Sequence, residues 1–176
     1  LLSSCNFDFN PITQFTPTPG APLVTSDQNL PHALVTFEAV VPGDGLEGFV
    51  ILEVLDEVTG LALNPQRYPM VEKTPGTYLV EIPIPIGSTD KYRYLRQGQA
   101  IAVEYTASGS QVRYRLAIID GPMVIQDIVA GWTDIPYNGP VGRIEGQVVV
   151  AESNTPVPSA LVICGGNRTV TASDGS

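Results

Sequence analysis

The sequence predicts an all-β protein, and three observations carry that prediction. Short runs of β-branched and aromatic residues recur along the chain, and several of them alternate with polar residues. No segment has the 3.6-residue periodicity of an amphipathic helix longer than one turn. The 176 residues include 17 glycines and 16 prolines, yet 43% of the chain is hydrophobic. These glycines and prolines therefore indicate frequent turns in a folded chain rather than disorder.

Seven strands with frequent turns predict an immunoglobulin-like antiparallel β-sandwich. The expected strand Phe49–Leu55 is apolar almost throughout, which predicts burial on both faces. The expected strand Lys91–Arg96 places Tyr92 and Tyr94 on one face. The Ser108-Gly109 turn predicts a hairpin between the fifth and sixth strands. Pro83 and Pro85 follow the third strand and cannot donate ladder hydrogen bonds, so they are expected at a sheet edge or outside the sheet. The expected strands are Leu34–Val41, Phe49–Leu55, Thr77–Ile82, Lys91–Arg96, Ala100–Thr106, Gln111–Ile119 and Met123–Val129.

The chain divides into four predicted parts. Residues 1–32 form an extended arm or stalk, residues 33–129 the sandwich, residues 130–141 a connector with the single Trp132, and residues 142–176 a second β-domain. Strands are expected in this tail at Arg143–Ala151, Ser159–Cys164 and Thr169–Ala172, before a turn at Asp174-Gly175. So few strands cannot bury enough apolar surface to be stable alone. We therefore expect the strands that complete this domain to come from a longer chain or from another molecule.

The charge of the chain excludes two classes of partner. The net charge is −9 and the isoelectric point is about 4.4. No basic stripe is present to neutralise phosphates, which argues against nucleic acid and against binding to anionic lipid. No run of 18 or more apolar residues predicts a membrane span.

The residues that could build an active site are sparse, so we expect no enzyme, metal or cofactor. His32 is the only histidine and is expected in a loop flanked by proline, and neither cysteine has a basic neighbour that would activate it. Zinc-ligand spacings are absent. Asp56 and Glu57 could bind calcium or act as acid and base, but adjacent residues at a strand end point to opposite faces, which favours a solvated turn.

The sandwich segment resembles the starch-binding carbohydrate modules. The resemblance covers about Leu34–Ile118 and rests on Val35-Thr36-Phe37, Tyr68-Pro69-Met70, Gly76-Thr77-Tyr78, Ile86-Gly87 and Lys91-Tyr92-Arg93-Tyr94. Such modules stack sugar rings on exposed aromatic side chains. Here one platform is missing, because Leu61–Pro65 contains Leu63 and no aromatic, and the other is replaced by Tyr105. The alternative is that the tyrosines of these strands pack across the sheet.

The tail resembles the start of a carboxypeptidase regulatory-like domain, a small transthyretin-like sandwich. The matching elements are Gly146-Gln147-Val148, Pro156–Val162 and Thr171–Gly175. In that family further strands follow. The resemblance implies a spacer or interaction module with no chemistry of its own.

The N-terminal residues resemble the end of a bacterial lipoprotein signal. Leu2-Ser3-Ser4-Cys5 is similar to a lipobox, in which the cysteine is lipidated. A buried free Cys5 and a disulfide with Cys164 are the alternatives. Asn167-Arg168-Thr169 is a sequon for N-glycosylation, and Thr16 and Thr18 beside prolines are candidate O-glycosylation sites. Together these features predict an extracellular or cell-surface protein that contacts a membrane only through a lipid anchor.

Two functions from different classes follow from these patterns. In the first, the protein is a structural, self-associating surface protein, with copies of itself as partners. Phe7, Phe9 and Ile12 of one copy would then add as a strand to the incomplete domain of the next, giving a filament. In the second, it is a lipid-anchored module that binds α-glucans through Tyr105. A third alternative is that the chain is a fragment of a larger surface lipoprotein.

Overall fold

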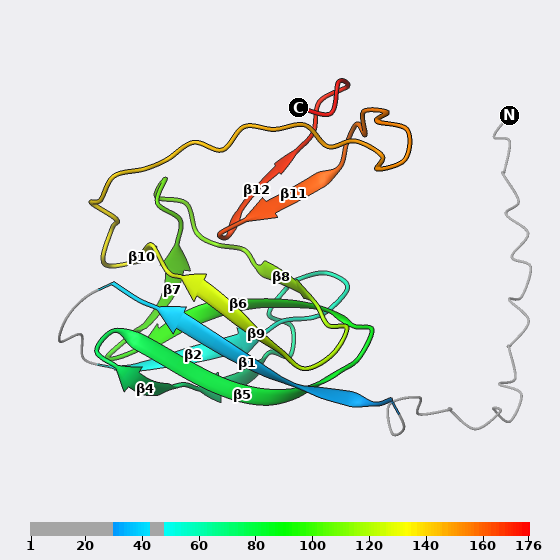
Figure 1. Cartoon of the computed structure of the whole chain (residues 1–176). Helices are drawn as coiled ribbons and strands as arrows, with labels where there is room; N and C mark the ends of the chain where they lie inside the picture. The colour runs from blue at the N-terminus through cyan, green and yellow to red at the C-terminus, as the bar shows by residue number, and fades with distance from the viewer. Residues whose placement is uncertain (1–29, 43–47) are drawn as a thin grey trace, which may run out of the picture.

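The computed structural model describes residues 30–42 and 48–176, and these residues contain strands and no helix (Figure 1). The prediction of an all-β, sandwich-like fold is therefore confirmed. None of the described residues form a helix with the length and hydrophobicity that a membrane span requires. The strands are β1 (His32–Val40), β2 (Phe49–Val54), β3 (Gln66–Pro69), β4 (Val71–Thr74), β5 (Thr77–Pro85), β6 (Thr89–Gln97), β7 (Ile101–Tyr105), β8 (Arg115–Ile118), β9 (Met123–Ile128), β10 (Gly131–Trp132), β11 (Leu161–Cys164) and β12 (Asn167–Val170).

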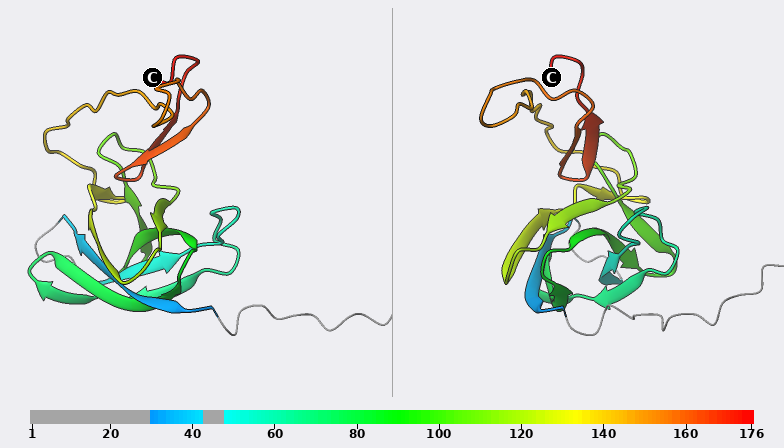
Figure 2. Two further views of the ribbon diagram at one scale, coloured as in Figure 1. Left: turned by 45° about the vertical axis from the view of Figure 1, so that its right-hand side comes forward. Right: turned by 90° about the vertical axis from the view of Figure 1, so that its right-hand side faces the viewer.

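Two open sheets face each other to form the sandwich. One has the strand order β4-β5-β1-β9, and the other has the order β10-β7-β6-β2-β3 with β8 also paired to β6. Figure 2 shows the two layers on opposite sides of the interior, and the β11–β12 hairpin projecting from one end. The described part of the chain thus consists of a sandwich and a small separate hairpin.

The core lies between these sheets and is built from alternating residues of β1, β2 and β6. Phe37, Leu52 and Tyr94 are fully buried in it. The Phe37 ring meets Tyr92 edge-on, with 4.9 Å between centroids. Tyr92 and Tyr94 share one face of β6, as their alternation predicts. β2 is buried on both faces, again as predicted, because Ile51 and Glu53 on its outer face are also covered.

One strand pair departs from the antiparallel expectation. β9 runs parallel to β1, with Val35 opposite Met123 and Val40 opposite Ile128. The chain crosses from β8 in one sheet to β9 in the other through the short Asp120–Pro122 turn. β8 and β9 therefore lie at neighbouring edges of the two sheets, and a side chain can reach from one to the other.

The predicted hairpin around Ser108-Gly109 is only partly formed. Thr106 and Ser110 bond at its base and Tyr105 bridges Gln111. Beyond this point β7 and β8 separate, because both pair with β6 and occupy different halves of it. The predicted hairpin therefore forms only next to its turn.

Pro83 and Pro85 lie within β5 rather than outside the sheet. Ile86 donates its backbone N–H to Pro31, so by alternation the nitrogens of both prolines face away from β1. On that side β4 reaches only as far as Leu79. This half of β5 is thus a sheet edge, which was one of the two predicted alternatives. His32, expected in a loop, is the first residue of β1 and pairs with Pro85.

The tail has fewer strands than its pattern predicts. Arg143–Ala151 was expected to form a strand, but only Val149 makes a bridge, to Pro156. Val148 makes backbone hydrogen bonds to Gly175 and Val157, and Val150 makes them to Thr155 and Asn154. A strand needs a neighbour along its whole length, and among the described residues none bonds to the backbone of residues 143–147. The turn at Asp174-Gly175 is present, with Gly175 at φ 80°.

Candidate functional site

Tyr105, the predicted sugar-stacking residue, lies at the end of β7. It pairs across the sheet with Gly131 and is half-buried. Among the described residues, the aromatic and cation–π contacts of the protein do not involve its ring. A single ring of this kind gives a sugar one contact rather than a platform.

The other large aromatic side chains of the sandwich are mostly unavailable to a ligand. Trp132 is 1% exposed and Tyr92, Tyr94 and Tyr114 are buried. Packing across the sheet, the alternative to a sugar site, accounts for Tyr92 and Tyr94, which belong to the core. α-Glucan binding through Tyr105 stays a prediction.

A buried ionic cluster joins the two sheets. The Arg115 guanidinium on β8 binds both Glu104 oxygens at 2.9–3.3 Å, and its Nη1 donates to Asp127 Oδ1 at 2.9 Å. Its Nη2 also donates to the Ile128 carbonyl at 2.9 Å. Glu104 is 0% exposed. The phenol groups of Tyr92 and Tyr94 both donate to Asp127 Oδ2 at 2.9 Å.

This cluster fills a gap in the hydrogen bonding of β6. The first half of β6 pairs with β8 up to Tyr92, and the second half pairs with β7 from Leu95. Tyr94 lies at the change of partner, and its backbone N–H donates to Glu104 Oε1 at 3.0 Å. The carboxylate therefore replaces a missing strand partner, which explains why a charge is buried here.

The two tyrosines and the arginine of this cluster keep their protons. Burial, followed by the charge of Asp127, raises the pKa of Tyr92 and of Tyr94 far above the usual value. Burial opposes the charge of Arg115, but attraction to Glu104 and its hydrogen bonds raise the pKa of the guanidinium. Neutral phenols and a fixed cation are suited to cross-linking the sheets rather than to exchanging protons.

Sequence reasoning missed this cluster, although one signal was present. Glu104 and Arg115 each alternate with inward-facing apolar residues, Ala102 and Ala117 respectively. An acid and a base at inward positions of two strands indicate a buried ion pair. A second buried carboxylate, Glu53, pairs with Arg67 and Arg93 on the two neighbouring strands.

Asp56 and Glu57 lie in a turn, as predicted. Asp56 Oδ1 accepts hydrogen bonds from the backbone N–H and the hydroxyl of Thr59, both at 2.7 Å. The bond from the hydroxyl, followed by the bond from the backbone, lowers the pKa of Asp56. Over residues 30–42 and 48–176 no group of His, Cys, Asp and Glu side chains is arranged to hold a metal ion.

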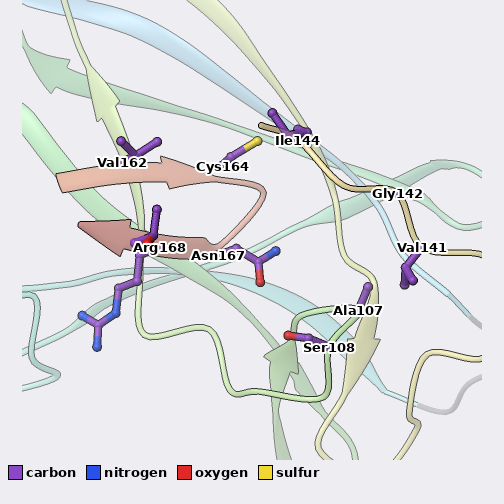
Figure 3. A pocket seen from close by; sticks show the side chains of 10 residues that line it. Ala107, Ser108, Val141, Gly142, Ile144, Val162, Cys164, Asn167 and Arg168 are labelled. Carbon is purple, nitrogen blue, oxygen red and sulfur yellow. The ribbon is translucent and has the colours of Figure 1, made fainter. Parts of the chain in front are cut away.

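An apolar groove separates the β11–β12 hairpin from the sandwich. Its volume is about 530 Å³, and its lining includes Val141, Ile144 and Val162 with Ala107 from the β7–β8 segment (Figure 3). Val141 and Ile144 are largely exposed. The hairpin itself contributes no buried residue from either strand. Exposed apolar surfaces of this kind are typical of interaction sites.

Of the remaining predicted sites, two lie at this groove and the others lie outside the residues that the structure describes. Asn167 is exposed at the start of β12 and lines the groove, and Cys164 is exposed and forms no disulfide among the described residues. Six predicted site residues lie outside the described residues: Cys5, Phe7, Phe9, Ile12, Thr16 and Thr18. Lipidation, assembly and O-glycosylation at these residues therefore stay predictions.

Comparison with known proteins leaves the family open. No protein-family model and no curated protein matches the chain. Among solved structures, Hormoconis resinae glucoamylase aligns with 64% of this chain and 19% of its own, at 16% identity and a TM-score of 0.41. A family 15 glucoamylase from Hypocrea jecorina aligns with 72% of this chain and 22% of its own, at 17% identity and a TM-score of 0.42.

The chain thus spans about a fifth of each glucoamylase. A likeness of this degree assigns neither a family nor an activity. The geometry of the chain itself defines its class, which is an all-β, sandwich-like protein. The resemblance of the tail to regulatory-like domains stays a prediction.

Proposed function

We propose that the protein is an extracellular structural protein, without enzymatic activity, that associates with copies of itself through β-strand addition. In this proposal the β11–β12 hairpin is the acceptor, and the N-terminal segment with Phe7, Phe9 and Ile12 is the donor. The single observation that supports it is the hairpin, a two-stranded sheet with no buried residue. Two strands alone are marginally stable, so a third strand would stabilise them.

The surroundings of the hairpin favour an apolar donor. Leu161 and Val170 oppose each other across the hairpin and are both more than half exposed. Val162 points to the other face of the hairpin and lines the groove, where Val141 and Ile144 also expose apolar surface. An added strand would bond to a free hairpin edge and cover this surface with alternate side chains.

The donor segment has the matching pattern. Phe7 and Phe9 are separated by one polar residue, so in an extended strand both rings point to the same face while Asp8 points to the other. The aromatic rings would contribute most of the buried apolar area. A head-to-tail contact of this kind does not close on itself and produces a filament.

Negative-stain electron microscopy of the full chain tests the proposal. We expect filaments from the unaltered chain, and none after deletion of Leu1–Pro19 or in the variant Phe7→Ser/Phe9→Ser. The variant Asp8→Ser/Asn10→Ser changes the opposite strand face and should still assemble. Filaments of normal length from the chain without its first 19 residues would reject the proposal.

A further inference from the structure

The basic residues of this chain divide into two groups. Six of the nine form ion pairs with carboxylates within the protein. The other three, Lys91, Arg113 and Arg168, have no carboxylate within ion-pair distance among the described residues. In a protein with a net charge of −9, unpaired cations are unexpected.

These three cations converge on one aromatic ring. The charged groups of Lys91, Arg113 and Arg168 lie 5.5, 5.9 and 6.0 Å from the centroid of Tyr114. They come from different parts of the fold: β6, the segment between β7 and β8, and β12 of the hairpin. The tertiary structure therefore gathers charges that are distant in the sequence.

The two arginines keep most of their hydrogen-bonding capacity. Lys91 Nζ donates to the carbonyls of Glu57 and Val58, so its bonds are largely used. Arg113 has one long contact, 3.5 Å, to the Thr59 carbonyl. The Arg168 side chain makes no hydrogen bond to any described residue, and both arginines are exposed. Each guanidinium group near Tyr114 therefore has free N–H donors, which suit oxyanions.

From this arrangement we propose that the surface formed by Arg113, Arg168 and Lys91 around Tyr114 binds an acidic peptide segment. The attraction of each cation to the ring offsets only part of the repulsion among the three. Carboxylates of a bound peptide would neutralise the arginines and accept their free N–H groups.

The chemistry of the chain favours a peptide over other polyanions. Its overall negative charge repels nucleic acid and anionic membranes at long range, whereas a short acidic segment experiences mainly the local field of the cluster. Every other cation of the protein is complemented by an Asp or Glu carboxylate. This inference is independent of strand addition to the hairpin.

Fluorescence anisotropy with a labelled hexaglutamate peptide on the full chain tests the proposal. We expect binding that weakens as NaCl is raised, and at least a tenfold loss of affinity in Arg113→Gln/Arg168→Gln. The matched control is Lys73→Gln/Arg143→Gln, which changes the net charge equally at two exposed residues outside the cluster. This control should bind within about twofold of the unaltered chain, since a local site is little affected by distant screened charges.

A second measurement separates a local site from general charge. Because Arg168 lies on β12, bound peptide should slow amide hydrogen exchange in β11 and β12, and this effect should vanish in the arginine double variant. Equal loss of affinity in both double variants, or no binding to the unaltered chain, would overturn the proposal. Binding of heparin without binding of hexaglutamate would overturn it in favour of a sulfated polysaccharide.

Discussion

Arg115 is the residue on which the connection between the two sheets depends. Its guanidinium binds Glu104 on β7 in one sheet and Asp127 and the Ile128 carbonyl on β9 in the other. A buried pair of this kind gives little net stability compared with apolar residues, but losing one partner leaves a buried charge without compensation. The cluster is therefore sensitive to single substitutions.

Replacing Arg115 alone should destabilise the protein strongly. We expect Arg115→Met to lower the free energy of unfolding by about 3–5 kcal/mol, because Glu104 stays buried without its cation. In Glu104→Leu/Arg115→Met no charge is left unpaired in the pair, so part of the loss should be recovered, although the Tyr94 N–H loses its acceptor and Asp127 its cation. Urea unfolding of the unaltered protein, the single variant and the double variant measures these free energies. Equal destabilisation in the single and double variants would contradict the argument.

The buried tyrosines predict loss of stability at high pH. In the folded state the pKa values of Tyr92 and Tyr94 are raised, by burial first and then by Asp127. Unfolded tyrosines release their protons near pH 10, while the folded ones keep them. The stabilising contribution is therefore complete below about pH 10 and is lost as the pH rises further.

Urea unfolding at pH 9 to 11 measures this loss. Each tyrosine should contribute a slope of up to about 1.4 kcal/mol per pH unit above pH 10. In the variant Tyr94→Phe, the slope of the unfolding free energy against pH should be smaller by about that amount. An unchanged slope in this variant would show that Tyr94 ionises equally easily in both states.

At the scale of the elements, the position of the β11–β12 hairpin depends on its turn. Gly166 has φ 79°, and a Cβ atom there would lie 2.7 Å from Cγ2 of the buried Val112. Gly165 has φ 53° but no atom within 4 Å of such a Cβ. Both glycines allow the turn. Only Gly166 also allows the turn to lie close to Val112 of the sandwich.

This difference gives a matched pair of variants. Gly166→Ala should move the hairpin away from Val112 and speed amide exchange in β11 and β12, while the sandwich keeps its protection. Gly165→Ala carries the backbone strain without the contact and should have a smaller effect. Hydrogen exchange followed by mass spectrometry compares them. Equal acceleration in both variants would mean that backbone strain alone is responsible.

The elements also show what the sequence could predict. Alternation located β1 and β6, since their inward residues must meet one core, and a nearly continuous apolar run located β2. These patterns missed β3 and β4, because each is four residues long and largely exposed. The partners of β6 on this side could not be predicted, since two strands, β7 and β8, share its length. The cation cluster at Tyr114 was likewise hidden, because its residues meet only through tertiary packing.

At the scale of the whole molecule, Trp132 determines where the sandwich ends. The sequence placed this residue in a connector, but it pairs with Glu104 in β10 and is 1% exposed in the core. Ile135 bonds to the Trp132 backbone and packs against the same core. The folded unit therefore includes the first residues of the predicted connector.

Two shortened chains test this limit. A chain that stops after Val129 lacks Trp132 and should lose about 3–5 kcal/mol of unfolding free energy, the usual cost of removing a buried aromatic side chain. A chain that stops after Val141 keeps Trp132 and Ile135. It lacks only a tail whose strands bury no residue, so its stability should stay within about 1 kcal/mol of the full chain. Thermal and urea unfolding distinguish these outcomes. If both shortened chains were equally unstable, the sandwich would depend on the hairpin as well, and the tail would be part of one folding unit.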